Sequence, residues 1–152
     1  MFIVSSCLIG NNCKYNGGNN YNEDVVEFCR NHEVILVCPE TSGGLKSPRM
    51  PAEQQYKKAS DGNLGIRVID KEGNDLTENF HKGAVVSLEQ AFKKADELSE
   101  EIEGAILKAN SPSCGSDNIY DGTFTGTLIS GDGIFANLLK ERGIPVMSEK
   151  NF

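Results

Sequence analysis

Residues 34–40 read VILVCPE, an apolar run that ends abruptly in a cysteine, a proline and a carboxylate. The same change occurs after FIV at 2–4, which continues as SSC at 5–7, and after AIL at 105–107, which leads to SPSCG at 111–115. Short, continuous apolar runs are typical of parallel strands that are covered on both faces. If these runs are neighbouring strands, their carboxyl ends share one crevice, where open α/β sheets bind ligands. The sequence therefore predicts a metal or thiolate site at these strand ends.

Helical patterns separate the apolar runs. Asn22 precedes two acidic residues, which suits a helix start, and we expect Cys29 to be a core residue on the apolar face of that helix. Thr77 is the expected N-cap of the longest helix, which runs from about 78 to 101 with apolar residues at helical spacing.

The C-terminal pattern completes the predicted sheet. A short helix is expected from Asp132-Gly133 to a stop at Gly143, and residues 144–147 read as a fourth strand. Strands that alternate with helices imply a parallel sheet with right-handed crossovers. The predicted fold class is therefore α/β and Rossmann-like, a mainly parallel sheet covered by helices, with a small β-hairpin insertion.

The hairpin insertion is expected before the longest helix. Residues 66–69 and 74–77 flank a turn at 70–73, and we expect this hairpin to sit over the sheet edge. Residues 40–59 show no periodic pattern and are predicted to form a long loop, which is usually a functional or disordered segment. The glycine pair at 43–44 in this loop would allow close approach of the backbone.

The composition indicates an ordinary globular chain. Its 152 residues suit one domain, residues 1–152, with 38% apolar and 24% charged residues. We expect a cytoplasmic protein without a membrane partner, because no stretch reaches roughly 20 apolar residues and Met1 leads directly into an apolar run. A net charge of −7 argues against stable nucleic-acid binding, which depends on many cationic contacts to phosphates. A small substrate suits this chain better, and its oligomeric state is left open.

Five cysteines are present, an odd number that does not suit a disulfide framework. Cys7, Cys13, Cys38 and Cys114 lie where the chain leaves the predicted core. They lack the C-x-x-C pairs of zinc ribbons, and the alternative is that each is a buried core residue. A shared metal site could be closed, or it could keep an open position that acts as a Lewis acid. A metal-free cysteine that forms a persulfide is a third alternative.

Two polar features accompany the cysteines. Glu40 follows Cys38 by two residues and could act as acid or base beside an open metal position, although a solvated loop glutamate is the alternative. The hydroxyls of residues 111–115 could orient substrate or relay protons, or they could bond the local turn. This segment lacks the G-x-S-x-G pattern of serine hydrolases. His32 and His81 fall at expected helix surfaces and are not proposed as catalytic.

Several motifs, in order along nearly the whole chain, together resemble those of the thiouracil desulfurase family. They are SSCLIG at 5–10, CKYNG at 13–17, CPE at 38–40, GGL at 43–45, PRMPAE at 48–53, LK at 107–108, SPSCG at 111–115 and YDGTF at 120–124. The resemblance implies a single desulfurase-like domain with an oxygen-sensitive 4Fe-4S cluster. Three cysteines would hold this cluster, so that one iron stays open.

On this sequence, the resemblance implies that Cys7, Cys38 and Cys114 are the cluster ligands, with Cys13 as a reserve ligand. Thiolates are the protein ligands that suit iron-sulfur clusters. The competing hypothesis is a non-catalytic metal- or cluster-binding module that carries a nucleotide or sulfur.

The resemblance also implies that Glu40 is the acid/base and that Ser111 relays protons. The thiocarbonyl sulfur would coordinate the open iron, activated water would attack the ring carbon, and sulfur would leave as cluster-bound sulfide. This reaction involves no net oxidation or reduction. The expected substrate is a small thiolated pyrimidine such as 2-thiouracil, a thiolated nucleoside or a related thioamide.

Overall fold

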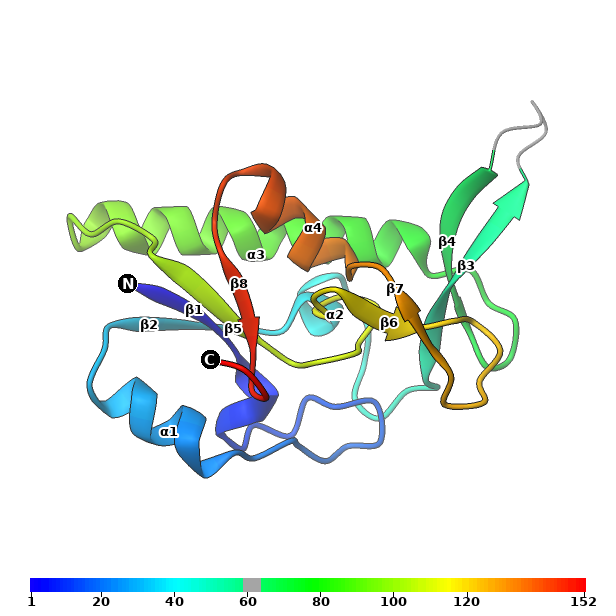
Figure 1. The fold of residues 1–152 in the computed structure, drawn as a ribbon, viewed down its shortest axis with the longest axis horizontal. Helices are drawn as coiled ribbons and strands as arrows, with labels where there is room; N and C mark the ends of the chain where they lie inside the picture. The colour runs from blue at the N-terminus through cyan, green and yellow to red at the C-terminus, as the bar shows by residue number, and fades with distance from the viewer. Residues whose placement is uncertain (59–63) are drawn as a thin grey trace.

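The computed structural model describes residues 1–58 and 64–152, and its centre is a sheet of four parallel strands (Figure 1). The strands are β1 (Phe2–Ser5), β2 (Val34–Val37), β5 (Gly104–Leu107) and β8 (Val146–Ser148). They lie in the order β2-β1-β5-β8, and each neighbouring pair is parallel. The chain continues from β1 toward one edge and from β5 toward the other. The gap between the carboxyl ends of β1 and β5 is therefore the topological switch point, where such sheets bind ligands.

Helices cover both faces of this sheet (Figure 1). α1 (Glu23–Arg30) lies on one face, whereas α3 (Thr77–Glu97) and α4 (Ile134–Glu141) lie on the other. Successive strand residues alternate between the two cores: Ile3 packs in the core shared with α3 and α4, and Val4 packs in the core shared with α1. The predicted α/β, Rossmann-like fold is confirmed.

The first helix begins as predicted. The side chain of Asn22 accepts a hydrogen bond from the amide of Val25 at 3.0 Å, which satisfies one of the free donors of the first turn. Cys29 packs against the core on the α1 side, but it is only partly buried, so the expectation of a core residue is met in part.

The longest helix differs from its prediction at both ends. Leu76 is the N-cap, and Thr77 is the first helical residue. The Thr77 hydroxyl binds the preceding segment instead: it accepts a hydrogen bond from the Val68 amide at 2.9 Å and donates one to Asp75 at 2.6 Å. The helix ends at Glu97 rather than near 101, since Ser99 takes a positive φ of 52° that no α-helix accommodates.

The hairpin insertion exists, but it pairs different residues from those predicted. β3 (Ala52–Lys58) is antiparallel to β4 (Leu64–Asp70), within a stretch that was expected to be a loop up to residue 59. Residue 59 lies outside the described part of the chain. The expected turn at 70–73 is present, but it leads only to a single bridge between Ile69 and Asp75. The hairpin lies beyond the carboxyl ends of the sheet rather than over an edge strand (Figure 1).

Shorter elements complete the description. They are the 3-10 turn η1 (Ser6–Ile9), the one-turn helix α2 (Pro39–Ser42), and a second ribbon of β6 (Asn118–Tyr120) and β7 (Leu128–Ser130). The predicted loop from residue 40 was therefore wrong at its start as well as at β3. The fourth strand begins two residues later than expected, at Val146.

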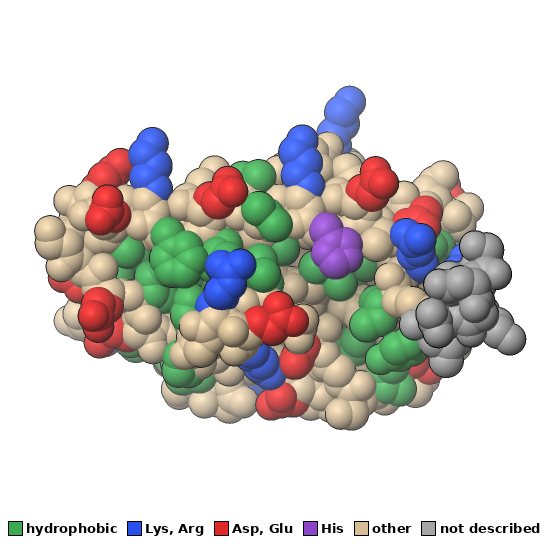
Figure 2. Space-filling model, turned by 90° about the horizontal axis from the view of Figure 1, so that it is seen from above, with side chains coloured by type: hydrophobic (Ala, Val, Ile, Leu, Met, Phe, Trp, Pro, Cys, Tyr) green, Lys and Arg blue, Asp and Glu red, His purple; other side chains and the backbone are tan. Residues whose placement is uncertain are grey.

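The outer face of α3 carries charged and hydrophobic side chains that are interspersed with one another (Figure 2). Within the described residues, no helix combines the length and apolar character that a membrane crossing requires.

Candidate active site

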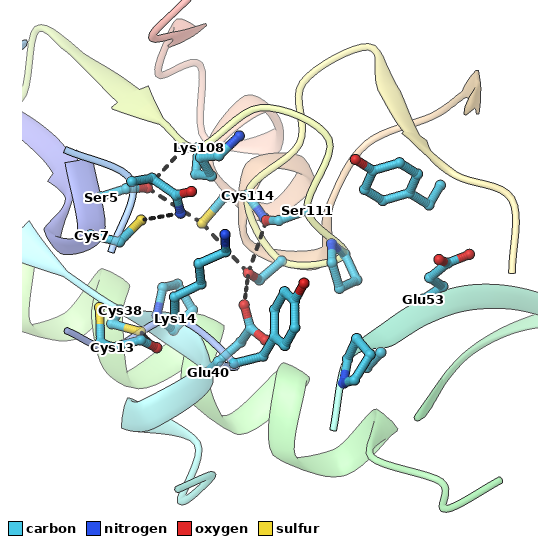
Figure 3. A pocket seen from close by; sticks show the side chains of 18 of the residues that line it. Ser5, Cys7, Cys13, Lys14, Cys38, Glu40, Glu53, Lys108, Ser111 and Cys114 are labelled. Atoms are coloured by element: carbon cyan, nitrogen blue, oxygen red, sulfur yellow. Dashed lines mark hydrogen bonds between the residues drawn. The ribbon is translucent and has the colours of Figure 1, made fainter. Parts of the chain in front are cut away.

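A cavity of about 430 Å³ opens beyond the carboxyl ends of β1, β2 and β5. Its wall includes every site residue predicted from the sequence, together with the reserve ligand: Cys7, Cys13, Cys38, Glu40, Ser111 and Cys114. The structure therefore brings together side chains that lie more than 100 residues apart (Figure 3). Cys29 does not line this cavity.

The positions of the three predicted ligands follow from the ends of the strands. Cys7 lies in η1 directly after β1, and Cys38 is the N-cap of α2 directly after β2. Cys114 lies in the turn after β5, where its amide donates a hydrogen bond to the Ser111 hydroxyl at 2.8 Å. Each parallel strand thus delivers one thiol to the same edge of the sheet.

Cys114 is the most enclosed of the four thiols, with 4% of the residue exposed. The hydroxyls of Ser5 and Ser113 each donate toward its sulfur at 3.6 Å. Burial raises the pKa of Cys114 to about 12, against the effect of these two hydroxyls. An electropositive group would therefore be needed to make this sulfur a thiolate at neutral pH.

Cys13 lies within hydrogen-bonding reach of both Cys7 and Cys38. Hydrogen bonding from Cys13 lowers the pKa of Cys38 to about 5 and also lowers the pKa of Cys7. The same contacts raise the pKa of Cys13 itself, because they hold its proton between two sulfurs. Asn20 adds a donor to the Cys7 sulfur at 3.4 Å. Cys7 and Cys38 are therefore disposed to be thiolates, the form that binds metals.

Glu40 has a largely buried side chain, 19% exposed, between a cation and a hydroxyl. Arg49 lies 3.4 Å from one carboxylate oxygen, and Ser113 donates to the other at 3.1 Å. Burial raises the pKa of Glu40, and the positive charge of Arg49 opposes that shift. Arg49 also donates to the Cys13 carbonyl at 3.0 Å, so one guanidinium joins the Cys13 loop to the carboxylate.

Ser111 does not contact Glu40 directly in this structure. Its hydroxyl lies 3.3 Å from that of Ser113, which in turn donates to Glu40. Ser113 is 1% exposed and has a single hydroxyl proton, which can be directed to Glu40 or to the Cys114 sulfur. Sequence reasoning assigned no individual role to Ser113, although it lies in the SPSCG motif at 111–115.

Two glycines allow α2, the helix that carries Glu40, to pack closely against α3. A Cβ atom at Gly83 would overlap the Pro39 carbonyl, and one at Gly43 would overlap the Asn79 carbonyl. Only glycine therefore allows α2 to approach α3 this closely, as the glycine pair in the sequence suggested for Gly43. This contact sets the position of Glu40 relative to the sheet.

Several supporting residues had little signal in the sequence. Ser5 follows an apolar run directly and could have been noted for its place at a strand end. Asn20 and Arg49 lie in irregular segments, where only the folded chain shows what they contact. Glu149, after β8, pairs with Lys108 at 2.8 Å and also accepts from the Ala109 amide, which braces the segment before Ser111.

The donor set fits an iron-sulfur cluster, because four cysteine thiols line the cavity and thiolates are the protein ligands of such clusters. Among the residues that the structure describes, no three His, Cys, Asp or Glu side chains form a group that could hold one metal ion. Arg49 lines the cavity, and its Nε is a buried donor without a hydrogen-bond partner in the described chain. Sulfur donors and an unsatisfied cationic N–H are suited to an anionic iron-sulfur group.

The fold and this site define a class of protein, an α/β protein with a thiol-lined cavity at the switch point of its sheet. The chain belongs to the 2-thiouracil desulfurase family, whose model matches residues 2–151. The uncharacterized protein YbbK of Bacillus subtilis (strain 168) is 41% identical over 150 residues, covering 98% of this chain and 95% of YbbK. The structure of the [4Fe-4S]-dependent thiouracil desulfidase TudS matches with a TM-score of 0.77 and 34% identity, covering 98% of this chain and 90% of TudS.

Proposed function

We propose that the protein is a 4Fe-4S-dependent desulfurase that converts the thiocarbonyl of a small thiolated pyrimidine, such as 2-thiouracil or a thiolated nucleoside, to a carbonyl and releases sulfide. The observation that carries the proposal is that Cys7, Cys38, Cys114 and Glu40 line one cavity in a member of the 2-thiouracil desulfurase family. TudS, the structural relative, is described as dependent on a 4Fe-4S cluster, which supports the same cofactor here.

Cys7, Cys38 and Cys114 would hold the cluster, which leaves one iron without a protein ligand. When bound, the cluster supplies a Lewis acid with affinity for the soft sulfur atom of the thiocarbonyl. Cys13 is the reserve ligand, and the position of its thiol beside Cys7 and Cys38 supports a second role, in which its one proton favours the thiolate form of its neighbours.

The proton chemistry falls to Glu40. Overall, C=S and one water become C=O and hydrogen sulfide, with no change in electron count. The Glu40 carboxylate is suited to accept a proton from water as its oxygen bonds to the ring carbon, and to return a proton to the departing sulfur. Arg49 and Ser113 hold its two oxygens, so the carboxylate is oriented before substrate binds. The Ser113 hydroxyl that donates to Glu40 lies 3.3 Å from the Ser111 hydroxyl. A chain of hydroxyls for proton transfer therefore runs from Glu40 through Ser113 to Ser111.

The test is anaerobic purification followed by iron and sulfide analysis and an assay of sulfide release from 2-thiouracil without an added reductant. We expect about four irons per chain and turnover that does not depend on an electron donor. A colourless protein that contains zinc would contradict the proposal and favour the carrier alternative. An absolute requirement for electrons would exclude the non-redox mechanism, and activity that persists after removal of all metal would favour a persulfide-forming cysteine.

A further inference from the structure

The end of the cavity away from the cysteines has no assigned role. Figure 3 shows Glu53 at this end, well separated from the cysteine side chains. Phe124 and Tyr120 also line the cavity: the Phe124 amide binds Glu53, and Tyr120 belongs to β6, which contacts β3. Glu53 comes from β3, whereas the two aromatic residues come from β6 and the loop that follows it. The β3-β4 and β6-β7 ribbons, which are separate from the central sheet, therefore supply this part of the cavity wall.

Glu53 is 8% exposed, and no cation pairs with it among the described residues. One carboxylate oxygen accepts hydrogen bonds from two backbone amides, those of Gly122 at 3.0 Å and Phe124 at 3.1 Å. Hydrogen bonds from amides to a carboxylate are stronger than those between neutral groups. The main contact of this buried charge is thus the loop at 121–127.

The conformation of the loop requires such support. Phe124 has a φ of 58°, in the left-handed region where a bulky side chain is an outlier. Strain of this kind persists only where the surroundings enforce it, and it gathers at ligand-binding sites. Gly122 provides the other constraint, since a Cβ atom there would lie 2.6 Å from the Gln54 carbonyl oxygen. The loop is held against β3 in a conformation that keeps Phe124 in the cavity wall.

We propose that Glu53 is a positioning residue that holds Phe124 in place, so that the rings of Phe124 and Tyr120 form the wall on which a planar pyrimidine ring stacks. This inference rests on the proposed function and adds to it a positioning residue and a wall that binds the substrate ring. Aromatic side chains gain from offset or edge contacts with flat rings, which an acyclic thioamide cannot provide. The Glu53 end therefore holds the flat ring of the substrate, while the chemistry takes place at the cysteine end.

The test compares Glu53→Ala, Glu53→Gln and Phe124→Gly with wild type at matched cluster content, verified by iron analysis. The readouts are kcat and KM for 2-thiouracil, and the calorimetric Kd for uracil, which binds without reacting. We expect Glu53→Ala and Phe124→Gly to raise KM and the uracil Kd about tenfold while kcat changes less than about threefold. Glu53→Gln keeps an acceptor oxygen and should restore most of the affinity.

Asp70 supplies a matched control. It is a buried carboxylate in the same hairpin, and one oxygen accepts two backbone amides, from Glu72 and Asn74, each at 2.9 Å. It does not line the cavity. Asp70→Ala should lower thermal stability as Glu53→Ala does, but leave KM and uracil binding unchanged. A merely structural role for Glu53 would make the two variants behave alike, which would overturn the inference.

The remaining outcomes are also decisive. Phe124→Gly keeps the inference testable if Glu53→Ala does not fold, because glycine accepts the positive φ without strain. Unchanged uracil affinity and KM in Phe124→Gly would refute the aromatic wall. A wild-type protein that binds uracil but releases no sulfide would refute the proposed function, while a weaker uracil Kd in Glu53→Ala would still support the inference.

Discussion

The two ends of the cavity are built by different parts of the fold. The cysteine end consists of segments that directly follow strands of the parallel sheet, whereas the Glu53 end consists of two antiparallel ribbons added beyond it. Strand ends anchored in a packed core hold the reacting groups rigidly, and ribbons can change in sequence without disturbing that core. The comparison suggests that the reaction type depends on the sheet and that substrate choice depends on the ribbons.

The strongest test of this division replaces, one at a time, the cysteines that line one end of the cavity. We expect Cys7→Ser, Cys38→Ser or Cys114→Ser to remove most of the cluster iron and with it all measurable desulfuration, because serine is a poor ligand for iron-sulfur clusters. Iron and sulfide analysis after anaerobic purification measures this effect.

Cys29→Ser is the matched control, since Cys29 packs against the α1-side core away from the cavity. It should reduce stability while leaving cluster content intact. Equal loss of iron in a folded Cys29→Ser protein would contradict the ligand assignment. If Cys13→Ser abolishes the cluster while Cys7→Ser does not, Cys13 is the ligand in its place.

The next effect separates proton transfer from cluster binding. Glu40→Gln and Ser111→Ala should keep the cluster but reduce kcat by roughly 10²-fold or more, as expected for a group that moves protons in the reaction. Glutamine preserves the shape of the side chain but has one acceptor oxygen, so either Arg49 or Ser113 loses its acceptor. Iron content and thermal stability of the variant therefore measure the structural loss separately from the loss in kcat. Full activity in both variants would remove these residues from the mechanism.

A smaller effect is expected at the close contact between α2 and α3. Replacing an exposed helical glycine with alanine usually stabilises a protein, by up to about 1 kcal/mol. Gly83→Ala should instead lower the free energy of unfolding by about 2 kcal/mol, because the added Cβ overlaps the Pro39 carbonyl. Denaturant titration measures this change, and Lys82→Ala, an exposed site on the same helix, is the control. A Gly83→Ala protein as stable as wild type would show that α2 can move, which would weaken the account of how Glu40 is positioned.

The sequence predicted the cysteine end better than the Glu53 end, for physical reasons. Apolar runs that stop at a cysteine mark the boundary between a covered strand and a loop, and this signal is local. β3 carries charged and polar residues on both faces of an isolated ribbon, so it lacks the apolar alternation by which strands are recognised. The hairpin was therefore predicted one strand too late in the chain. Residues of β4 were taken as its first strand, and its turn was placed at residues 70–73.

Contacts that depend on tertiary packing also could not be predicted from the sequence. Glu40 and Ser111 were each predicted as site residues, but the link between them through Ser113 depends on the packing of α2 on α3, which brings the carboxylate to the turn after β5. Likewise, Glu53 was part of a recognised motif without a role, because its partners at Gly122 and Phe124 lie about 70 residues away.

The smallest expected effect concerns a second contact to the 121–127 loop at the Glu53 end of the cavity. Gln55 also binds the 121–127 loop, through a hydrogen bond from its side-chain amide to the Gly122 carbonyl at 2.9 Å, but it does not line the cavity. In Gln55→Ala the two amide contacts of Glu53 remain, and a neutral hydrogen bond contributes only about 1 kcal/mol. We therefore expect KM for 2-thiouracil to rise by at most about fivefold, with kcat and cluster content unchanged. Steady-state kinetics on Gln55→Ala and Glu53→Ala side by side measure the difference, and equal KM values would mean that general docking of the loop, rather than the Glu53 carboxylate, positions Phe124.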